Sequence, residues 1–318
     1  MATQHLTVPE AAGRPARRLE AESRRYGEKA IKAFLALCAA LSVITTVAIV
    51  VSLLGPAIGF FQHVPLTEFF GSTQWFPSQE FFGVLPLVVG TVNVVLWSMV
   101  FAIPVGLGAA IYLSEYAPRR VRKVIKPVLE VLAGIPTVAI GFFGFYFLVP
   151  LLRDIWPGNF LGGPPGAYMA GAAAMCVGLM IVPIISSISE DAMSSVPSGL
   201  REGAYALGAS RMRVALRVVV PAALSGIVAS IVLGVSRAIG ETMIVLMVAG
   251  NLANMSINPV DIVQAMTAYI GITATGDIAT GTVEYDTIFA VGVLLFAMTL
   301  VMNLISIRFV RKFREVYE

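Results

Sequence analysis

Arg237 and Glu241 are the residues whose types and spacing most clearly allow chemistry. Both lie within an apolar stretch, 221–250, that is otherwise typical of a membrane-spanning helix. A charged side chain at membrane depth costs about 2.5–3.5 kcal/mol on insertion scales, so its presence calls for a compensating role. On a continuous helix, residues four apart share one face. The pair therefore predicts either a site for a charged solute or ion inside a membrane, or a structural ion pair that neutralises itself.

The composition is that of a polytopic membrane protein. Of 318 residues, 57% are hydrophobic and 13% are charged, and the mean hydropathy is +0.84, whereas soluble domains carry about 25% charged residues. A helix that crosses a bilayer needs about 20 mostly apolar residues. Six segments meet this requirement: 31–54, which ends at Gly55-Pro56, then 85–113, 127–152, 167–188, 221–249 and 287–307. The sequence predicts an all-α integral membrane protein with six transmembrane helices in contact with membrane lipid.

The basic residues predict the orientation of the chain. All but two of the 22 lysines and arginines fall in the segments 1–32, 114–126, 189–220 and 308–318, which six spans place on one side. The positive-inside rule assigns that side to the cytoplasm. The outer loops carry one base, Arg153, and seven acids, Glu68, Glu80, Asp154, Asp261, Asp277, Glu284 and Asp286. We expect a multi-pass protein of the cell (inner) membrane with both termini cytoplasmic, and an outer face that is either simply solvated or docks a folded extracellular partner.

The chain is expected to have four parts. Residues 1–30 are basic and lack apolar periodicity, which predicts a flexible cytoplasmic tail. Residues 31–84 hold the first span and an outer loop rich in aromatic rings, which either anchor it at the membrane interface or help a partner to dock. Residues 85–310 hold the other spans, and 311–318 form a short cytoplasmic tail. In the last outer connection, Asn258 as N-cap, Pro259 as first residue and Gly271 as stop predict a short helix over 260–270.

The cytoplasmic loop before the fifth predicted span contains signals for two short helices. Pro197 and Ser198 are typical of a helix start, Gly208 interrupts that helix, and Ser210 can cap a second helix that runs to Pro221. Such an elbow suits a socket on another protein, although an ordinary re-entry loop would carry the same signals.

The residues of this loop resemble the EAA loop of ABC-importer permeases. Glu202-Gly203-Ala204, then Gly208, then Val218-x-Val220-Pro221 match the spacing of Glu-Ala-Ala, three residues, Gly, nine residues and Ile-x-Leu-Pro. Gly203 replaces an alanine, and valines replace Ile and Leu. The resemblance implies a type I ABC-importer permease domain over 85–310. It also implies that Glu202, Gly203, Ala204, Gly208 and Pro221 form a coupling loop that seats in a separate ATPase subunit.

Three further segments narrow the resemblance. Residues 129–144 and 236–243 resemble the phosphate-specific subgroup, and 75–91 resemble its PstC-type member. Such importers comprise a second permease (PstA-like), an ATPase dimer (PstB-like) that binds ATP and Mg, and an extracellular phosphate-binding protein (PstS-like). The resemblance implies that this chain is a permease subunit of an ATP-driven phosphate importer. It would form half of the translocation path, with Arg237 and Glu241 in that path.

A phosphate ion would give the two charged residues separate roles. Arg237 offers a planar fork of N–H donors that fits a tetrahedral oxyanion. Glu241 can accept a hydrogen bond from the P–OH group that phosphate keeps near neutral pH and sulfate lacks, which would select against sulfate. The hydroxyls of Thr242 and Ser236 either contact the ion weakly or bond back to helix carbonyls. Because the two charges cancel, we expect the partner permease to supply a second base.

Other classes of protein fit the sequence less well. There is no Gly-Lys pair and hence no P-loop, so the chain should neither hydrolyse ATP nor hold a cofactor of its own. We expect no enzyme activity, no catalytic residue, no metal site and no nucleic-acid partner. Two alternatives stay open: a permease for another oxyanion such as molybdate or phosphonate, and a non-transporting membrane scaffold or sensor. The coupling loop argues against the scaffold, because a scaffold needs no ATPase socket.

Overall fold

The computed structural model describes residues 26–155 and 166–312. The chain divides into two units at Ile49, and the described part of the first unit is the beginning of α1 (Tyr26–His63). Residues 28–49 of this helix are exposed throughout, as expected for an apolar span that faces lipid. The predicted tail over 1–30 lies outside the described residues up to position 25. From the predicted tail over 311–318, residues 313–318 lie outside them as well.

The second unit holds the rest of the secondary structure. The segment that was predicted to lie outside, which we call the outer segment, comprises α2 (Leu66–Gly71), β1 (Trp75–Phe76), η1 (Pro77–Gln79) and β2 (Phe81–Phe82), where β1 and β2 form an antiparallel pair. The helices that follow are α3 (Leu85–Ile111), η2 (Tyr112–Tyr116), α4 (Arg119–Ala133), α5 (Thr137–Phe143), η3 (Gly144–Leu148), α6 (Val149–Ile155) and α7 (Ala170–Ser194). Next come α8 (Ser198–Ala206), α9 (Arg211–Val214), η5 (Ala215–Val219), α10 (Val220–Ala222), α11 (Leu224–Ile239), α12 (Met243–Val248), α13 (Met266–Thr275) and α14 (Val283–Lys312).

The membrane-spanning helices largely confirm the hydropathy prediction. Five helical stretches among the described residues are long and apolar enough to cross a membrane. They are Glu28–His63, Leu85–Tyr116, Thr137–Ile155, Ala170–Ser194 and Val283–Arg308. A sixth arises if Arg211–Ala222 and Leu224–Ile239, which meet at a bend of 73°, count as one span. The fold is that of an all-α membrane protein, in agreement with the sequence.

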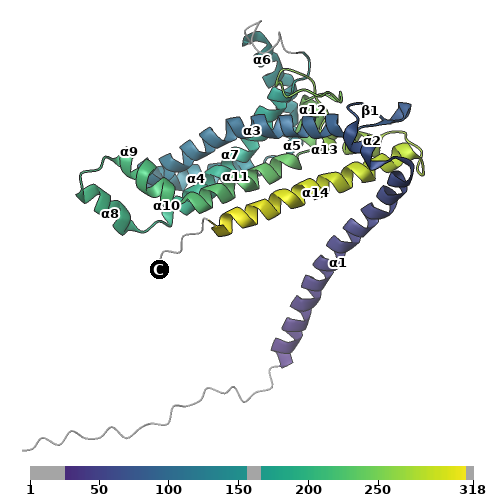
Figure 1. Ribbon diagram of the computed structural model, residues 1–318. Coiled ribbons are helices and arrows are strands. Elements are labelled where there is room, and N and C mark those ends of the chain that lie inside the picture. The colour runs from purple at the N-terminus through teal and green to yellow at the C-terminus, as the bar shows by residue number, and fades with distance from the viewer. Residues whose placement is uncertain (1–25, 156–165, 313–318) are drawn as a thin grey trace, which may run out of the picture. The chain divides into compact units, whose positions relative to one another are not determined.

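The helix α7 lies at the centre of the second unit. It packs against α3, α4, α11 and α12, and Figure 1 shows α3, α7, α11 and α14 running alongside one another. Small residues make this packing close: a Cβ on Gly234 of α11 would lie only 2.8 Å from the side chain of Ile181. A Cβ on Gly178 would lie 2.7 Å from the ring of Phe101. Gly234 therefore serves close helix packing, because a methyl group there would push α11 away from α7.

Two predicted span boundaries are wrong. The first span was expected to end at Gly55-Pro56, but α1 continues through Pro56 to His63. A proline removes one helical hydrogen bond, whereas the next two turns bury Phe60 and Val64. The third span was expected over 127–152. In the structure α4 ends at Ala133, and the helix is interrupted at Gly134 and Pro136. The span then covers Thr137–Ile155.

The aromatic residues of the outer segment form a core of their own. Phe60, Phe69, Trp75 and Phe82 are buried. The ring of Phe69 makes edge-on contacts, with ring centroids 5.0–6.3 Å apart, with the rings of Phe60, Phe61, Phe70 and Trp75. Trp75 also meets the ring of Tyr269 at 5.0 Å. The prediction of interface anchoring is therefore wrong for these buried rings, which tie α1, the outer hairpin and α13 together.

The short helix of the last outer connection is displaced from its predicted place. It was expected over 260–270, but α13 spans Met266–Thr275, and Gly271 lies inside it. The carbonyls of Ser256 and Asn258 accept hydrogen bonds from the Asn93 amide of α3, at 2.8 and 3.2 Å. Those of Pro259 and Asp261 accept from Gly171 and Ala170 in the first turn of α7. Because these carbonyls serve tertiary contacts, they do not form the predicted helical turns.

Candidate functional site

The predicted fifth span is interrupted between Arg237 and Glu241. The helix α11 ends at Ile239, Gly240 follows as its C-terminal cap, and α12 begins only at Met243. The carbonyl of Glu241 accepts a 2.7 Å hydrogen bond from the Thr267 hydroxyl of α13, so it is used outside the helix. The prediction of one continuous helix over 221–249 is therefore wrong. Gly240 ends α11 and does not serve close packing, since its nearest neighbours across the Cβ position lie 3.9 Å away.

The buried side chain of Glu241 stabilises the break between α11 and α12. Its side chain is buried, with 3% exposed, and one carboxylate oxygen accepts a 3.3 Å hydrogen bond from the backbone N–H of Ile244. A carboxylate that accepts a free N–H at the start of a helix caps that helix. Glu241 thus caps α12, and in this conformation its carboxylate contacts backbone.

Arg237 has a different environment from Glu241. It lies exposed in the last turn of α11, and its guanidinium approaches the Met180 sulfur of α7 at 3.6 Å. Within the described residues, no ion pair joins Arg237 to Glu241, so the self-neutralising pair considered from the sequence is not present. The guanidinium keeps most of its donors available at membrane depth.

The break also explains the order of the two charges. On one helix, an arginine that precedes a glutamate opposes the helix dipole. On two separate helices, Arg237 lies near the C-terminal end of α11 and Glu241 lies before the N-terminal end of α12. Each charge is then on the side that its own helix favours. The order that is unfavourable on a continuous helix is favourable here.

The hydroxyls beside the break are used locally. Thr242 donates a 3.3 Å hydrogen bond to the Gly240 carbonyl, which matches the expectation that it bonds back to backbone. Ser236 donates instead to the side-chain oxygen of Asn303 in α14, at 3.0 Å, so its hydroxyl joins two helices. Among these three side chains, Arg237 is therefore the one that still has N–H donors available for hydrogen bonds.

The loop before the fifth predicted span forms the predicted elbow. The helix α8 covers Ser198–Ala206, Gly208 takes a left-handed φ of +79°, and Ser210 accepts a 3.4 Å hydrogen bond from the N–H of Arg213 as α9 begins. We call the segment 198–222 the elbow; Figure 1 shows it at the opposite end of the second unit from β1 and α2. A residue with a Cβ would be strained at Gly208. The local signals were therefore sufficient to predict this structure.

The residues of the predicted coupling loop do not all have the same environment. Glu202, Gly203, Gly208 and Pro221 are exposed. Ala204 is half-buried against the apolar cluster that seats the elbow, whose buried members are Ala110, Met193, Val196, Val214, Val219, Ala223 and Ile227. Leu207, at the tip of the elbow, is 90% exposed. An apolar side chain this exposed at a helix–glycine–helix tip is suited to insertion into another protein.

A buried glutamate in α7 was not identified from the sequence. Glu190 is fully buried and binds Arg122 and Lys126 of α4, the latter at 3.0 Å, as well as the Ser194 hydroxyl at 2.9 Å. Lys126 also binds Asp191. The basic segment 114–126 was used only to orient the chain. A charged residue close to the end of an apolar span was the available signal, because such a residue requires partners.

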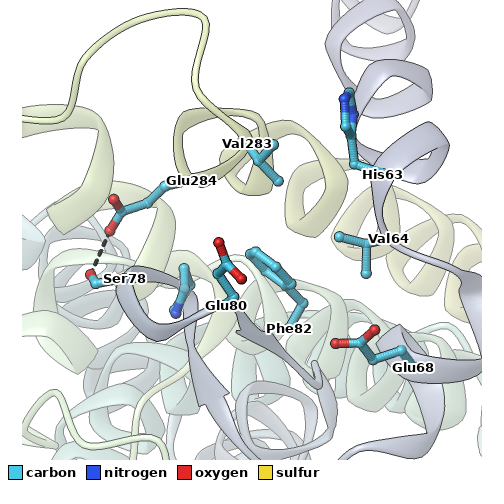
Figure 2. Close-up of a pocket in the computed structure, with 9 residues that line it drawn as sticks. His63, Val64, Glu68, Ser78, Glu80, Phe82, Val283 and Glu284 are labelled. Carbon is cyan, nitrogen blue, oxygen red and sulfur yellow. Dashed lines mark hydrogen bonds between the residues drawn. The ribbon is translucent and has the colours of Figure 1, made fainter.

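An acidic cavity lies among α2, η1 and the first turn of α14. His63, Glu68, Glu80 and Glu284 line a space of about 500 Å³, and Ser78 donates a 2.7 Å hydrogen bond to Glu284. Figure 2 shows the three carboxylates around the same hollow. Within residues 26–155 and 166–312, no group of three His, Cys, Asp or Glu side chains could hold a metal ion.

Comparisons with known proteins identify the family. Residues 102–315 match the family model described as binding-protein-dependent transport system inner membrane component. A probable ABC transporter permease, YqgH of Bacillus subtilis (strain 168), is 36% identical, covering 93% of this chain and 94% of the relative. The phosphate transport system permease PstC of Haemophilus influenzae is 32% identical, covering 92% of this chain and 98% of the relative.

A solved structure supports the fold independently. A bacterial alginate ABC transporter superposes with a TM-score of 0.59 at 18% identity, covering 89% of this chain and 96% of that one. At this identity the similarity concerns the fold alone. Together with the family match and the spans, it identifies the architecture as that of a type I ABC importer permease. The chain belongs to the family of binding-protein-dependent transport system inner membrane components, and it is the permease component of an ABC importer.

Proposed function

We propose that this chain is the PstC-type permease of an ATP-driven phosphate importer. The observation that carries the proposal is the exposed guanidinium of Arg237 at membrane depth, near Met180 and unpaired with Glu241. Its planar donors fit a tetrahedral oxyanion. The relatives named PstC support phosphate as that oxyanion; the one from Haemophilus influenzae is 32% identical over most of the chain.

In the proposed transport path, Arg237 binds the phosphate ion directly, and Glu241 and Thr242 lie beside it. In the conformation described here, Glu241 caps α12 and fixes the position of the break. Its second carboxylate oxygen could accept a hydrogen bond from a phosphate P–OH, but the buried side chain must first become accessible to the path. A single arginine balances less than the charge of a phosphate dianion, so we expect the partner permease to supply a second base to the same path.

The other subunits follow from the same proposal. We infer a PstA-like second permease, a PstB-like ATPase dimer that binds ATP and Mg, and a PstS-like binding protein on the outer side. The positive-inside rule places both termini and the elbow in the cytoplasm. Uptake of labelled phosphate by cells that lack this chain tests the proposal in a strain with no second phosphate system. Loss of high-affinity uptake, restored by the chain, is expected; unchanged uptake would favour the scaffold alternative.

The elbow provides a separate prediction about the ATPase. Burying a leucine is worth about 1.5–3 kcal/mol, and Leu207 is 90% exposed at the tip of the elbow. Leu207→Ser should therefore weaken binding of the ATPase by about tenfold or more. The measurement is the amount of ATPase that co-purifies with the tagged permease at several concentrations. Leu252→Ser is the matched control, because Leu252 is an exposed leucine of the outer loop. Equal recovery with both variants would exclude Leu207 from the ATPase contact.

A further inference from the structure

One arginine fastens the elbow to the rest of the protein. Arg201 of α8 donates to the carbonyls of Val196 and Met193, at 2.5 and 2.6 Å, where α7 ends. The same guanidinium binds Glu115 at 3.2–3.3 Å through two of its nitrogens. Glu115 lies in η2, the π-helical continuation of α3, and accepts a further hydrogen bond from Ser114. Arg201 thus joins three elements at one point.

The burial of this contact makes it strong. The side chains of Arg201 and Glu115 are 19% and 5% exposed, so water competes weakly for their hydrogen bonds. Met193 lies in the last turn of α7 and Val196 just beyond it, and the Met193 carbonyl also accepts a 3.2 Å hydrogen bond from the N–H of Val196. A guanidinium can serve these acceptors and a carboxylate together because its donors lie in one planar fork, which a lysine lacks.

The second arm of the elbow also contacts η2. The guanidinium of Arg211 in α9 lies 5.6 Å from the centre of the Tyr116 ring. Tyr116 follows Glu115 directly, so both arms of the elbow meet the same π-helical turn. Displacement of the elbow would therefore act on the ends of α3 and α7 together.

From the end of α7, direct contacts lead to Arg237. The buried hydroxyls of Ser189 in α7 and Ser230 in α11 lie 2.8 Å apart. Gly226 of α11 faces Ala192 so closely that a Cβ on the glycine would lie 2.3 Å from the alanine methyl group. Farther along the same two helices, Arg237 reaches Met180. The helices α7 and α11 are therefore in contact from the elbow to the candidate site.

We propose that Arg201 is a positioning residue that fastens the elbow to α3 and α7, so that movement of the elbow is transmitted to the helices around Arg237. The transmission rests on the proposed function, because it assumes that an ATPase moves the elbow. The fastening itself rests on the contacts of Arg201 alone. Glu115 is its main charged partner, and removal of either residue should release α8 while leaving the apolar seat of the elbow in place.

The fastening is tested by amide hydrogen exchange of the purified full chain in detergent. Arg201→Ala and Glu115→Gln should speed exchange over residues 198–207 by about tenfold, since release of a contact lowers the free energy of local opening. Arg213→Ala is the matched control, because this exposed arginine of the same elbow has no side-chain partner among the described residues. Exchange in Arg201→Ala that equals exchange in Arg213→Ala would overturn the proposal.

The transmission is tested in the reconstituted complex with the partner permease, the ATPase and the binding protein. Labelled phosphate uptake and ATP hydrolysis are measured together. Arg201→Ala should keep the ATPase bound and hydrolysing while uptake per ATP falls by about fivefold, and Arg201→Lys should recover part of the loss. Unchanged uptake per ATP in Arg201→Ala would contradict the transmission. A wild-type chain that binds no ATPase would refute the proposed function, and the exchange measurement would still decide the fastening.

Discussion

Arg237→Ala should lower phosphate uptake by about 100-fold, and Arg237→Lys by about tenfold, in a complex that still assembles. A hydrogen bond to a charged group is worth about 1.5–3 kcal/mol, and each 1.36 kcal/mol changes a rate about tenfold. Lysine keeps the charge but loses the planar fork, so its smaller loss separates geometry from charge. Uptake of labelled phosphate measures both effects, and co-purification of the ATPase confirms assembly.

Arg153 provides the control for this experiment. It is the other basic residue outside the four basic segments, and it is exposed near the end of α6. Arg153→Ala should leave uptake unchanged. Wild-type uptake by Arg237→Lys would show that the fork geometry has no role, and wild-type uptake by Arg237→Ala would remove Arg237 from the path.

Loss of the bases around Glu190 should destabilise the protein more than loss of Glu190 itself. Glu190 is fully buried, whereas the side chains of Arg122 and Lys126 are 37% and 28% exposed. Removing one side of a buried ion pair costs about 3–5 kcal/mol when an uncompensated charge is left buried. The double variant Arg122→Gln with Lys126→Gln leaves such a charge. Glu190→Gln leaves two bases that water can reach, so its cost should be smaller.

Thermal unfolding of the detergent-solubilised chain measures this difference. Lys123→Gln is the matched control, because Lys123 is exposed on the same helix, α4. We expect the double variant to have the lowest unfolding temperature and Glu190→Gln an intermediate one. Lys123→Gln should unfold close to the temperature of the wild type. A double variant that unfolds no earlier than Lys123→Gln would mean that the Glu190 cluster contributes nothing to stability.

The local signals in the sequence were sufficient for much of the fold. The span α3 was predicted within two residues and α7 within six, because a bilayer requires a long apolar run. The elbow was predicted almost completely, since Pro197, Gly208 and Ser210 act on their immediate neighbours. Signals of this kind do not depend on which other segments lie nearby.

Features that depend on distant contacts could not be predicted in this way. The break at Gly240 is supported by Thr267, which lies 26 residues from Glu241. The displacement of α13 depends on Asn93 and on the first turn of α7. The relation between the two candidate residues also differs from the prediction, since Arg237 lies in the last turn of α11, Glu241 lies in the break before α12, and the two do not pair.

The buried contacts of the elbow and those of Glu190 also join residues that are far apart in the sequence. Glu115 and Arg201 are 86 residues apart, and Arg122 and Glu190 are 68 apart. Their charges were visible in the sequence, but only the packing of η2, α4, α7 and α8 brings them together. Charge counting assigned these residues to the cytoplasmic side and could not assign partners.

Transport by proteoliposomes that contain the complete complex tests the central claim most directly. With ATP available to the ATPase and the binding protein outside, labelled phosphate should accumulate, and excess unlabelled phosphate should block it. Excess sulfate, which lacks a P–OH group, should leave accumulation unchanged. Arg237→Lys should reduce accumulation in the same vesicles. Absence of ATP-dependent phosphate accumulation, or equal competition by sulfate, would contradict the assignment of this chain as a phosphate permease.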